Sequence, residues 1–234
     1  MPDSTICYQI SQSYAVAPWT RAYIALKVAW DPLFDVACEH IRHQNQQVLD
    51  IGCGFGLLGM TMRKSSLPLR YRGIDTDISK LNISKEAVRY FGFSEVGFEA
   101  NDATNSPIPE RVTVCLFDVL HCLDRSSQAQ MLNRLADAAA NGSLILIRSK
   151  FQSTGWRYIF TLTGKLFRLA TLSMPKCFPS RAKLLELFEN RGLQVDLVPL
   201  KNKIFWRGDL IVVRGQNHFQ SATDAPVIVK EEMF

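Results

Sequence analysis

The sequence predicts an α/β fold: a doubly wound, seven-stranded mixed sheet covered by helices. Three observations support this fold class. Apolar, β-branched segments alternate with helical segments, as in βαβ units with parallel strands. A glycine-rich turn follows the first of these strands, at residues 52–59. The last two predicted strands are joined by only eight residues, 201–208, which requires an antiparallel pair and gives the sheet an antiparallel last strand.

Length and composition are those of one ordinary globular domain. The chain has 234 residues, of which 47% are hydrophobic and 21% charged, and this excludes a disordered, collagen-like or disulfide-scaffold chain. The net charge of +5 is only a weak indication of an acidic partner. Six cysteines without a C-x-x-C pair predict a reducing cytoplasm and no metal site. Neither a signal peptide nor an apolar run long enough to span a membrane is present in the sequence.

The first part of the chain predicts a helical cap over residues 1–44. Its first 14 residues are polar and are expected to be loose. Residues 14–43 have a helical pattern that is interrupted at Asp31-Pro32. There the aspartate can cap a new helix and the proline suits the first turn of that helix.

Strands and helices then alternate over residues 45–215. The strands are expected at 47–51, 69–74, 96–99, 111–117, 144–148, 194–200 and 209–213. The helices are expected at 57–63, 77–90, 125–140 and 180–190. The continuous apolar run at 111–117 (RVTVCLF) is typical of a strand buried on both faces. Asp124 is expected to cap one helix, which ends at Asn141-Gly142, and Gly192 closes the last helix.

Two segments are additions to this pattern. Residues 156–172, within an insertion at about 151–178, have an apolar face and a face with Arg157, Lys165 and Arg168. This segment is either an ordinary packed helix, a lid over a lipophilic substrate, or a basic surface for a bilayer or an acidic carrier protein. From residue 216 the composition turns polar, so 216–234 is expected to be a disordered tail.

The strongest local signal is V-L-D-I-G-C-G-F-G-L-L-G at residues 48–59. Its glycines let the backbone turn sharply after a strand and let a ligand approach main-chain N–H groups at the start of the next helix. Read from Gly54, the segment also matches G-x-G-x-x-G, a dinucleotide fingerprint that is weak by itself.

Two further acids follow neighbouring strands. Asp75 lies 19 residues after Gly56, where a carboxylate can accept both ribose hydroxyls of a nucleoside. Asp102 follows the third strand, where it can reach an adenine edge or, equally, cap a turn. Between NAD and S-adenosylmethionine, Asp50 favours the latter, because an acid at this strand end can orient the ligand's cationic amino-acid part.

In order and spacing, V-L-D-I-G-C-G-F-G, G-I-D, N-D-A and D-V-L-H resemble the class I S-adenosylmethionine-dependent methyltransferases, over about residues 45–150 and the terminal hairpin. The resemblance implies S-adenosylmethionine as cofactor and makes 45–215 a methyltransferase domain. It implies that the glycines cradle the methionyl end, that Asp75 takes the ribose, and that Asp102 takes the adenine amino group. The implied cofactor-binding residues are Asp50, Gly52, Gly54, Gly56, Asp75, Asp102 and Ala103, the last beside the adenine ring.

A narrower resemblance concerns the acceptor. Lys27 with Asp31-Pro32, the Gly-Leu-Leu-Gly helix start, Asp118-Val-Leu-His and Ile147-Arg148 resemble methyltransferases of bacterial lipid and aryl-polyene-type polyketide pathways. This resemblance implies a lipophilic acceptor of lipid, acyl or aryl type.

Three residues at the ends of the fourth and fifth strands are candidate catalytic residues. His121 is the best candidate base because histidine titrates near neutrality, and the alternative is that it caps or packs the turn. Asp118 is a candidate catalytic residue at the mouth of the same crevice, and the alternative is that it contacts the cofactor's amino group. Arg148 is expected either to hold an anionic group of the substrate or to form a structural salt bridge. The aromatic side chains before residue 31 could form the other wall of the site.

The sequence therefore predicts methyl transfer from S-adenosylmethionine to a lipophilic small molecule. The alternatives are an NAD-dependent oxidoreductase, an RNA or protein methyltransferase, and a non-catalytic interaction module with the same fold. An acyl carrier protein or a membrane surface is an expected partner, and no nucleic acid is expected. The expected location is the cytoplasm, including the inner face of the membrane.

Overall fold

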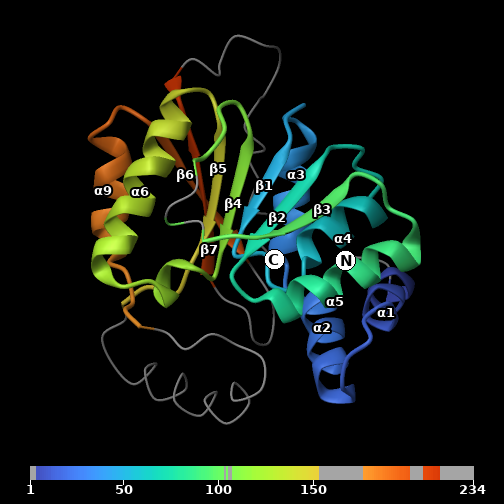
Figure 1. The fold of residues 1–234 in the computed structure, drawn as a ribbon. Coiled ribbons are helices and arrows are strands. Elements are labelled where there is room, and N and C mark those ends of the chain that lie inside the picture. The colour runs from blue at the N-terminus through green and yellow to red at the C-terminus, as the bar shows by residue number, and fades with distance from the viewer. Residues whose placement is uncertain (1–3, 103, 105–106, 153–175, 201–207, 217–234) are drawn as a thin grey trace, which may run out of the picture.

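The computed structural model describes residues 4–102, 104, 107–152, 176–200 and 208–216 (Figure 1). Their strands form one seven-stranded sheet with the order β3-β2-β1-β4-β5-β7-β6. The strands are β1 (Val48–Ile51), β2 (Tyr71–Asp75), β3 (Val96–Ala100), β4 (Thr113–Phe117), β5 (Leu144–Arg148), β6 (Gln194–Leu200) and β7 (Gly208–Arg214).

The sheet is mixed, as the sequence predicts. Strands β1 to β5 pair in parallel, and β7 runs antiparallel to both β5 and β6. The chain moves outward from β1 through β2 to β3 and then returns to place β4 on the other side of β1. The point between β1 and β4 is therefore a topological switch point, and ligands of open α/β sheets bind at the carboxyl ends of such strands.

Helices cover both faces of the sheet, and each face has its own core. Alternate residues of β5 point to opposite faces: Leu144 and Leu146 join the core beneath α1 to α5, whereas Ile145 and Ile147 join the core beneath α6 and α9. The helices are α1 (Ser4–Gln12), α2 (Pro18–Trp30), α3 (Leu33–Arg42), α4 (Leu57–Lys64), α5 (Ile78–Phe91), α6 (Arg125–Ala140) and α9 (Arg181–Glu189).

Side-chain caps begin most of the helices after α2. Asp77, Asp124 and Ser180 each accept a hydrogen bond from a backbone N–H in the first turn of α5, α6 and α9 respectively. Pro32 is the N-cap residue of α3, and the preceding Asp31 accepts from the N–H of Leu33 through its Oδ1 at 3.1 Å, so the aspartate bonds to the start of this helix. Helix α4 instead follows Gly56, which has a left-handed backbone.

Two expectations about the chain's local structure are wrong. The first 14 residues are not loose, because residues 4–12 form α1, with Ile10 and Tyr14 fully buried in the core that α2 and α4 share. Burial of a few apolar side chains is enough to stabilise this helix in an otherwise polar segment. The fourth strand begins at Thr113 rather than at residue 111, because Arg111 has φ 53°, which no strand residue adopts.

Several predictions fall outside the described residues. They concern the amphipathic segment 156–172 and most of the insertion at 151–178, of which residues 151–152 and 176–178 are described. The predicted tail at 216–234 also lies outside, apart from Gln216. In the part of the chain that the structure describes, no helix is long and apolar enough to cross a bilayer.

Candidate active site

The glycine turn after β1 has the backbone that a ligand cradle needs. Gly52, Gly54 and Gly56 have φ of 70°, 54° and 64°, in the left-handed region that glycine adopts without a steric penalty. A methyl group placed on Gly56 would lie 2.4 Å from the ring of Phe98, whereas one on Gly54 would meet no protein atom within 4 Å. The turn is therefore closed against β3 at Gly56 and open at Gly54.

Asp75 is tied directly to this turn. Its Oδ2 accepts from the N–H of Gly54 at 2.7 Å, and its Oδ1 accepts from the N–H of Asp77 at 2.9 Å. Each carboxylate oxygen still has an acceptor site, because an ionised carboxylate accepts about four hydrogen bonds in all. The end of β2 thus presents a fixed acceptor beside the glycine cradle, as the ribose assignment requires.

Asp102 lies in the loop after β3, where it makes a turn and also lines the cavity. Its Oδ1 accepts from the backbone N–H of Thr104 at 2.9 Å and from the Thr104 hydroxyl at 2.7 Å. These two hydrogen bonds lower the pKa of the Asp102 carboxyl. The carboxylate therefore stays ionised and available as an acceptor. Ala103, the predicted neighbour of the adenine ring, lies outside the described residues.

Asp50 is an almost fully buried acid on β1, only 4% exposed. Its Oδ2 accepts from the hydroxyl of Tyr71 at 2.6 Å. Burial raises the pKa of Asp50, the hydrogen bond from Tyr71 lowers it, and the charge of Asp75 raises it further, giving a pKa of about 7. Tyr71 was not singled out from the sequence as part of the site. The signal that was available is a tyrosine at the start of a buried strand, where an aliphatic residue is usual.

One cavity of about 800 Å3 connects these groups. The glycine turn and the three acids Asp50, Asp75 and Asp102 line it together with side chains after β4 and β5 and side chains of the N-terminal helices. Its size lies within the usual range for small-molecule sites. The cavity thus joins the predicted cofactor residues to the predicted catalytic residues His121, Asp118 and Arg148, all of which also line it.

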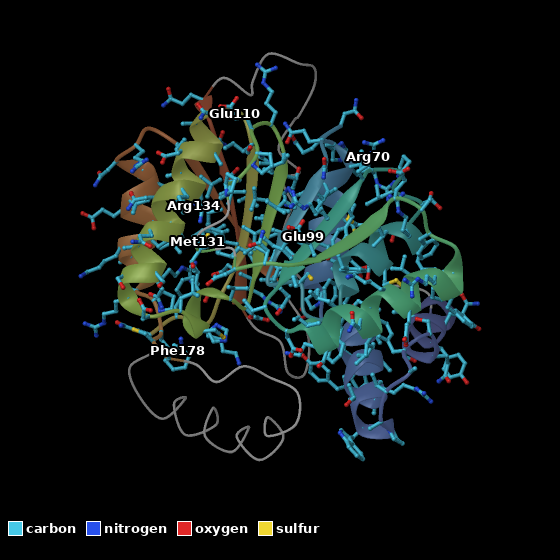
Figure 2. All side chains as sticks on the ribbon, viewed as in Figure 1. Arg70, Glu99, Glu110, Met131, Arg134 and Phe178 are labelled. Atoms are coloured by element: carbon cyan, nitrogen blue, oxygen red, sulfur yellow. The ribbon has the colours of Figure 1, made fainter. Side chains whose placement is uncertain are left out.

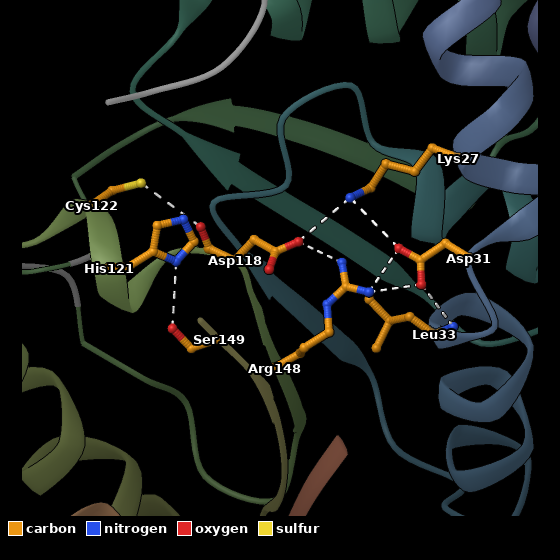
Figure 3. A network of polar contacts seen from close by, with 8 residues as sticks. All are labelled: Lys27, Asp31, Leu33, Asp118, His121, Cys122, Arg148 and Ser149. Carbon is orange, nitrogen blue, oxygen red and sulfur yellow. Dashed lines mark hydrogen bonds and ion pairs between the residues drawn. The ribbon is translucent and has the colours of Figure 1, made fainter. Parts of the chain in front are cut away.

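Arg148 is held by two carboxylates (Figure 3). Its Nη1 lies 2.7 Å from both oxygens of Asp31, and its Nη2 forms a short ion pair with Asp118. Lys27 on α2 completes the cluster, with its Nζ 3.5 Å from Asp118 and 3.7 Å from Asp31. The structure thus forms the salt bridge that the sequence left open for Arg148, and binding of a substrate anion by Arg148 stays a prediction.

The same cluster fixes the charge of Asp118. Burial raises the pKa of this carboxyl, but the positive charges of Arg148 and Lys27 lower it more, and the net pKa is well below the ordinary value. Asp118 also has φ 61°, which is uncommon for a residue other than glycine and is characteristic of functional turns. A carboxylate that is already paired and ionised is a poor proton acceptor at neutral pH, so its role in this geometry is electrostatic.

His121 lies in the short 3-10 helix η1 (Leu120–Cys122), which follows β4. The residue is 5% exposed, and its ring stacks on Phe178 with 6.1 Å between ring centroids and has its Nδ1 3.5 Å from the hydroxyl of Ser149. Figure 2 shows Phe178 at the lower end of the molecule, where α6 begins. His121 is thus oriented from two sides and still lines the cavity.

The aromatic segment before residue 31 contributes one side chain to the cavity wall, Tyr23. Tyr14 stabilises the glycine turn, because its buried hydroxyl donates a hydrogen bond to the carbonyl of Phe55 at 2.6 Å. Trp19 and Trp30 are 62% and 45% exposed and are not among the residues that line the cavity. In the described residues, no group of three or more His, Cys, Asp or Glu side chains could hold a metal ion.

Comparison with known proteins agrees with this geometry. Residues 48–142, from β1 to the residues after α6, match the family model described as a methyltransferase domain. No curated protein matches the sequence of the chain.

Solved structures resemble the fold at low sequence identity. Magnesium protoporphyrin IX methyltransferase from Synechocystis PCC 6803, with bound S-adenosylhomocysteine, is 14% identical (TM-score 0.61), and the match covers 89% of this chain and 93% of that one. A SAM-dependent methyltransferase from Aquifex aeolicus is 16% identical (TM-score 0.55; 91% and 97% covered). An O-methyltransferase from neocarzinostatin biosynthesis, in complex with S-adenosylhomocysteine and 1,4-dihydroxy-2-naphthoic acid, is 19% identical (TM-score 0.56; 84% and 56% covered).

The residues present fit S-adenosylmethionine. The open position at Gly54 leaves room for a ligand against the backbone, and acids for a cationic amino group, a ribose and an amino-bearing base line the same cavity. Gly54 and these acids all lie within the matched range, 48–142. Lys27, Asp31 and Arg148 of the ion-pair cluster lie outside it. Residues 48–142 thus match a methyltransferase domain, and the described residues have the seven-stranded fold of these solved S-adenosylmethionine-dependent methyltransferases.

Proposed function

We propose that the protein methylates a lipophilic small molecule of lipid, acyl or aryl type. The observation that carries this proposal is an apolar stripe on α2, one side chain of which lines the cavity. Trp19, Tyr23, Leu26 and Trp30 lie within about 60° of one another on the helix, at 100° per residue. Trp19, Leu26 and Trp30 are between 45% and 62% exposed, and Tyr23 lines the cavity. An apolar acceptor can therefore follow one helix face into the site.

For methyl transfer from this cofactor, the protein mainly has to position the acceptor. S-adenosylmethionine supplies a sulfonium methyl that is already activated for transfer. Holding a nucleophile in line with that methyl contributes roughly 7–11 kcal/mol. We assign the acceptor's proton to His121, because Asp118 is already paired and ionised. The methyl group thus moves to the acceptor atom while His121 takes the proton that this atom loses.

Similar proteins add support of a general kind. The O-methyltransferase from neocarzinostatin biosynthesis was crystallised with an aromatic acid, and a mitomycin 7-O-methyltransferase is also similar in fold (17% identical, TM-score 0.56). This chain's match covers only 56% of each of these two proteins.

The acceptor class is tested by transfer of a labelled methyl group. We would incubate the protein with labelled S-adenosylmethionine and a host extract, and then separate lipid, carrier-bound, RNA and protein fractions. Label in the lipid or carrier-bound fraction is expected, and with the Asp75→Ala variant it should fall several-fold when the cofactor is limiting. Label in RNA or protein would contradict the proposal and favour the corresponding alternative.

The same stripe on α2 fits contact with a membrane surface, since tryptophan favours the interface between water and lipid. The amphipathic segment 156–172, which also motivates this contact and contact with an acidic carrier, lies outside the described residues. We expect the protein to sediment with anionic phospholipid vesicles and the Trp19→Ser, Trp30→Ser double variant to sediment several-fold less. Equal sedimentation of the two proteins would argue against this surface.

A further inference from the structure

We propose that Tyr71 is a positioning residue for the cofactor: its buried hydroxyl orients the Asp50 carboxylate and holds it in the form that binds the ammonium group of S-adenosylmethionine. The proposal rests on the assignment of S-adenosylmethionine as the cofactor and does not depend on which acceptor is methylated. Its starting point is the 2.6 Å hydrogen bond from the Tyr71 hydroxyl to Asp50 Oδ2, between two side chains that are 2% and 4% exposed.

The two strands are built so that this hydroxyl reaches Asp50. In the parallel register of β1 and β2, Tyr71 is opposite Val48, and Gly73 is opposite Asp50. Tyr71 must therefore extend two residues along the sheet to reach the carboxylate. Its ring also lies close against α4, where a methyl group on Gly59 would approach the ring to 2.8 Å.

Glycine at position 73 is part of the same arrangement. A methyl group there would lie 2.7 Å from the sulfur of Cys53 and 2.9 Å from the ring of Phe98. The Phe98 ring in turn packs edge-to-face on Tyr71, with 5.9 Å between centroids. Gly59 thus makes room for the Tyr71 ring, and Gly73 makes room for the Phe98 ring that packs on it, while the Tyr71 hydroxyl lies at Asp50.

Asp50 has no positive partner among the described residues. The titratable groups around it are Tyr71 and Asp75 from β2, Cys53 from the glycine turn and Cys115 from β4, and none of them is a cation. A buried carboxylate without a cation is costly, so the group partly gives up its charge, and its pKa is about 7. The Tyr71 hydrogen bond is the protein's own contribution that favours the ionised form.

A ligand that brings a positive charge to this carboxylate removes the cost. Asp50 lines the cavity, and the amino-acid end of the cofactor carries an ammonium group. Tyr71 remains a donor throughout, because burial and the charge of Asp50 raise the pKa of its hydroxyl far above the usual value. Without the hydroxyl, Asp50 would be protonated at neutral pH and would bind the ammonium weakly.

The variant Tyr71→Phe removes only the hydroxyl. We would measure the affinity for S-adenosylhomocysteine by isothermal titration calorimetry between pH 6 and 8.5. In the wild-type protein the affinity should rise with pH through about 7, as Asp50 ionises. In Tyr71→Phe the rise should move up by about one pH unit or more, with roughly tenfold weaker binding at pH 7. Once the acceptor has been identified, Tyr71→Phe should have a higher KM for the cofactor than the wild-type protein and a nearly equal kcat.

Two controls separate positioning from packing. Tyr14→Phe removes an equally buried hydroxyl whose partner, the carbonyl of Phe55, does not titrate, so any loss of affinity should be the same at every pH. In an Asp50→Asn background, Tyr71→Phe should cause no further pH-dependent loss. The same pH profile for Tyr71→Phe and the wild-type protein would overturn the proposal.

A second measurement needs no variant. The carboxyl resonance of Asp50, followed by carbon NMR in the wild-type protein, should titrate near pH 7 without ligand and at lower pH with S-adenosylhomocysteine bound. A midpoint near 4, the ordinary aspartate value, in the free protein would also overturn the proposal. Failure to bind S-adenosylhomocysteine at any pH would instead contradict the cofactor assignment itself.

Discussion

Nη1 of Arg148 lies 2.7 Å from both carboxylate oxygens of Asp31, and this contact joins residues 117 positions apart in the sequence. Asp31 lies between α2 and α3, whereas Arg148 ends β5, so the pair connects the N-terminal cap to an interior strand of the sheet (Figure 3). Both side chains are almost fully buried, with 0% and 9% of their side-chain areas exposed. The cap is therefore an integral part of the site's structure.

Loss of Arg148 should destabilise the protein strongly. Arg148→Met keeps an apolar side chain of similar length but leaves Asp31 buried without its main partner. The free energy of unfolding, measured with urea, should fall by about 3–5 kcal/mol. The matched control is Arg191→Met in the exposed pair with Asp137, which should cost about 1 kcal/mol or less. Similar costs for the two variants would mean that the buried pair does not hold the cap.

Asp118 should make the protein sensitive to acid. Its folded-state pKa lies below its ordinary value, so the unfolded chain binds the proton more readily than the folded one. The stability that Asp118 contributes is present above the ordinary pKa near 4 and is lost as the pH falls below it. Between pH 5 and pH 3 the free energy of unfolding should therefore fall more steeply for the wild-type protein than for Asp118→Asn. Parallel curves would contradict the pairing of Asp118 with Arg148 and Lys27.

The two glycines of the turn should respond differently to alanine. Gly56→Ala forces a methyl group to 2.4 Å from the Phe98 ring and should lower the melting temperature markedly. Gly54→Ala carries only the cost of a left-handed alanine, about 1 kcal/mol, since no protein atom lies within 4 Å of the new methyl group. Its methyl group should instead weaken binding of S-adenosylhomocysteine, which calorimetry measures. A stable Gly54→Ala protein with unchanged affinity would place the ligand elsewhere.

Replacement of His121 should lower turnover far more than cofactor binding. For the acceptor found by the labelling experiment, His121→Ala should reduce kcat by about 100-fold or more, as loss of a general base does. Ser149→Ala removes only the hydroxyl beside Nδ1 and should cost much less. Retention of full turnover by His121→Ala across the pH range would exclude the base assignment.

The sequence was sufficient to predict most of the fold, because each strand and helix carries its own local signal. The alternation of strands and helices, the antiparallel pairing of β6 with β7 and the cap at Asp124 follow from period, connection length and residue type. Helix α1 was missed because it depends on burial of Ile10 against other helices, a tertiary effect that a polar local sequence does not reveal.

The site was predicted where one motif supplies it and missed where distant segments meet. The glycine turn and Asp75 line the same cavity, as their motif predicts, and the Gly54 N–H donates a hydrogen bond to the Asp75 carboxylate. The pairing of Arg148 with Asp31 and the contact of Tyr71 with Asp50 depend on strand order and side-chain reach. Periodicity indicates which residues are buried, but it does not indicate which buried polar groups become partners.

The most direct test of the cofactor assignment is calorimetric titration of the wild-type protein and Asp75→Ala with S-adenosylhomocysteine and with NADH. Glu99→Ala, on the neighbouring strand β3 and outside the cavity lining, is the matched control. We predict that the wild-type protein and Glu99→Ala bind S-adenosylhomocysteine equally, that Asp75→Ala binds it about tenfold more weakly or worse, and that NADH does not bind. Tight binding of NADH without binding of S-adenosylhomocysteine would contradict the account.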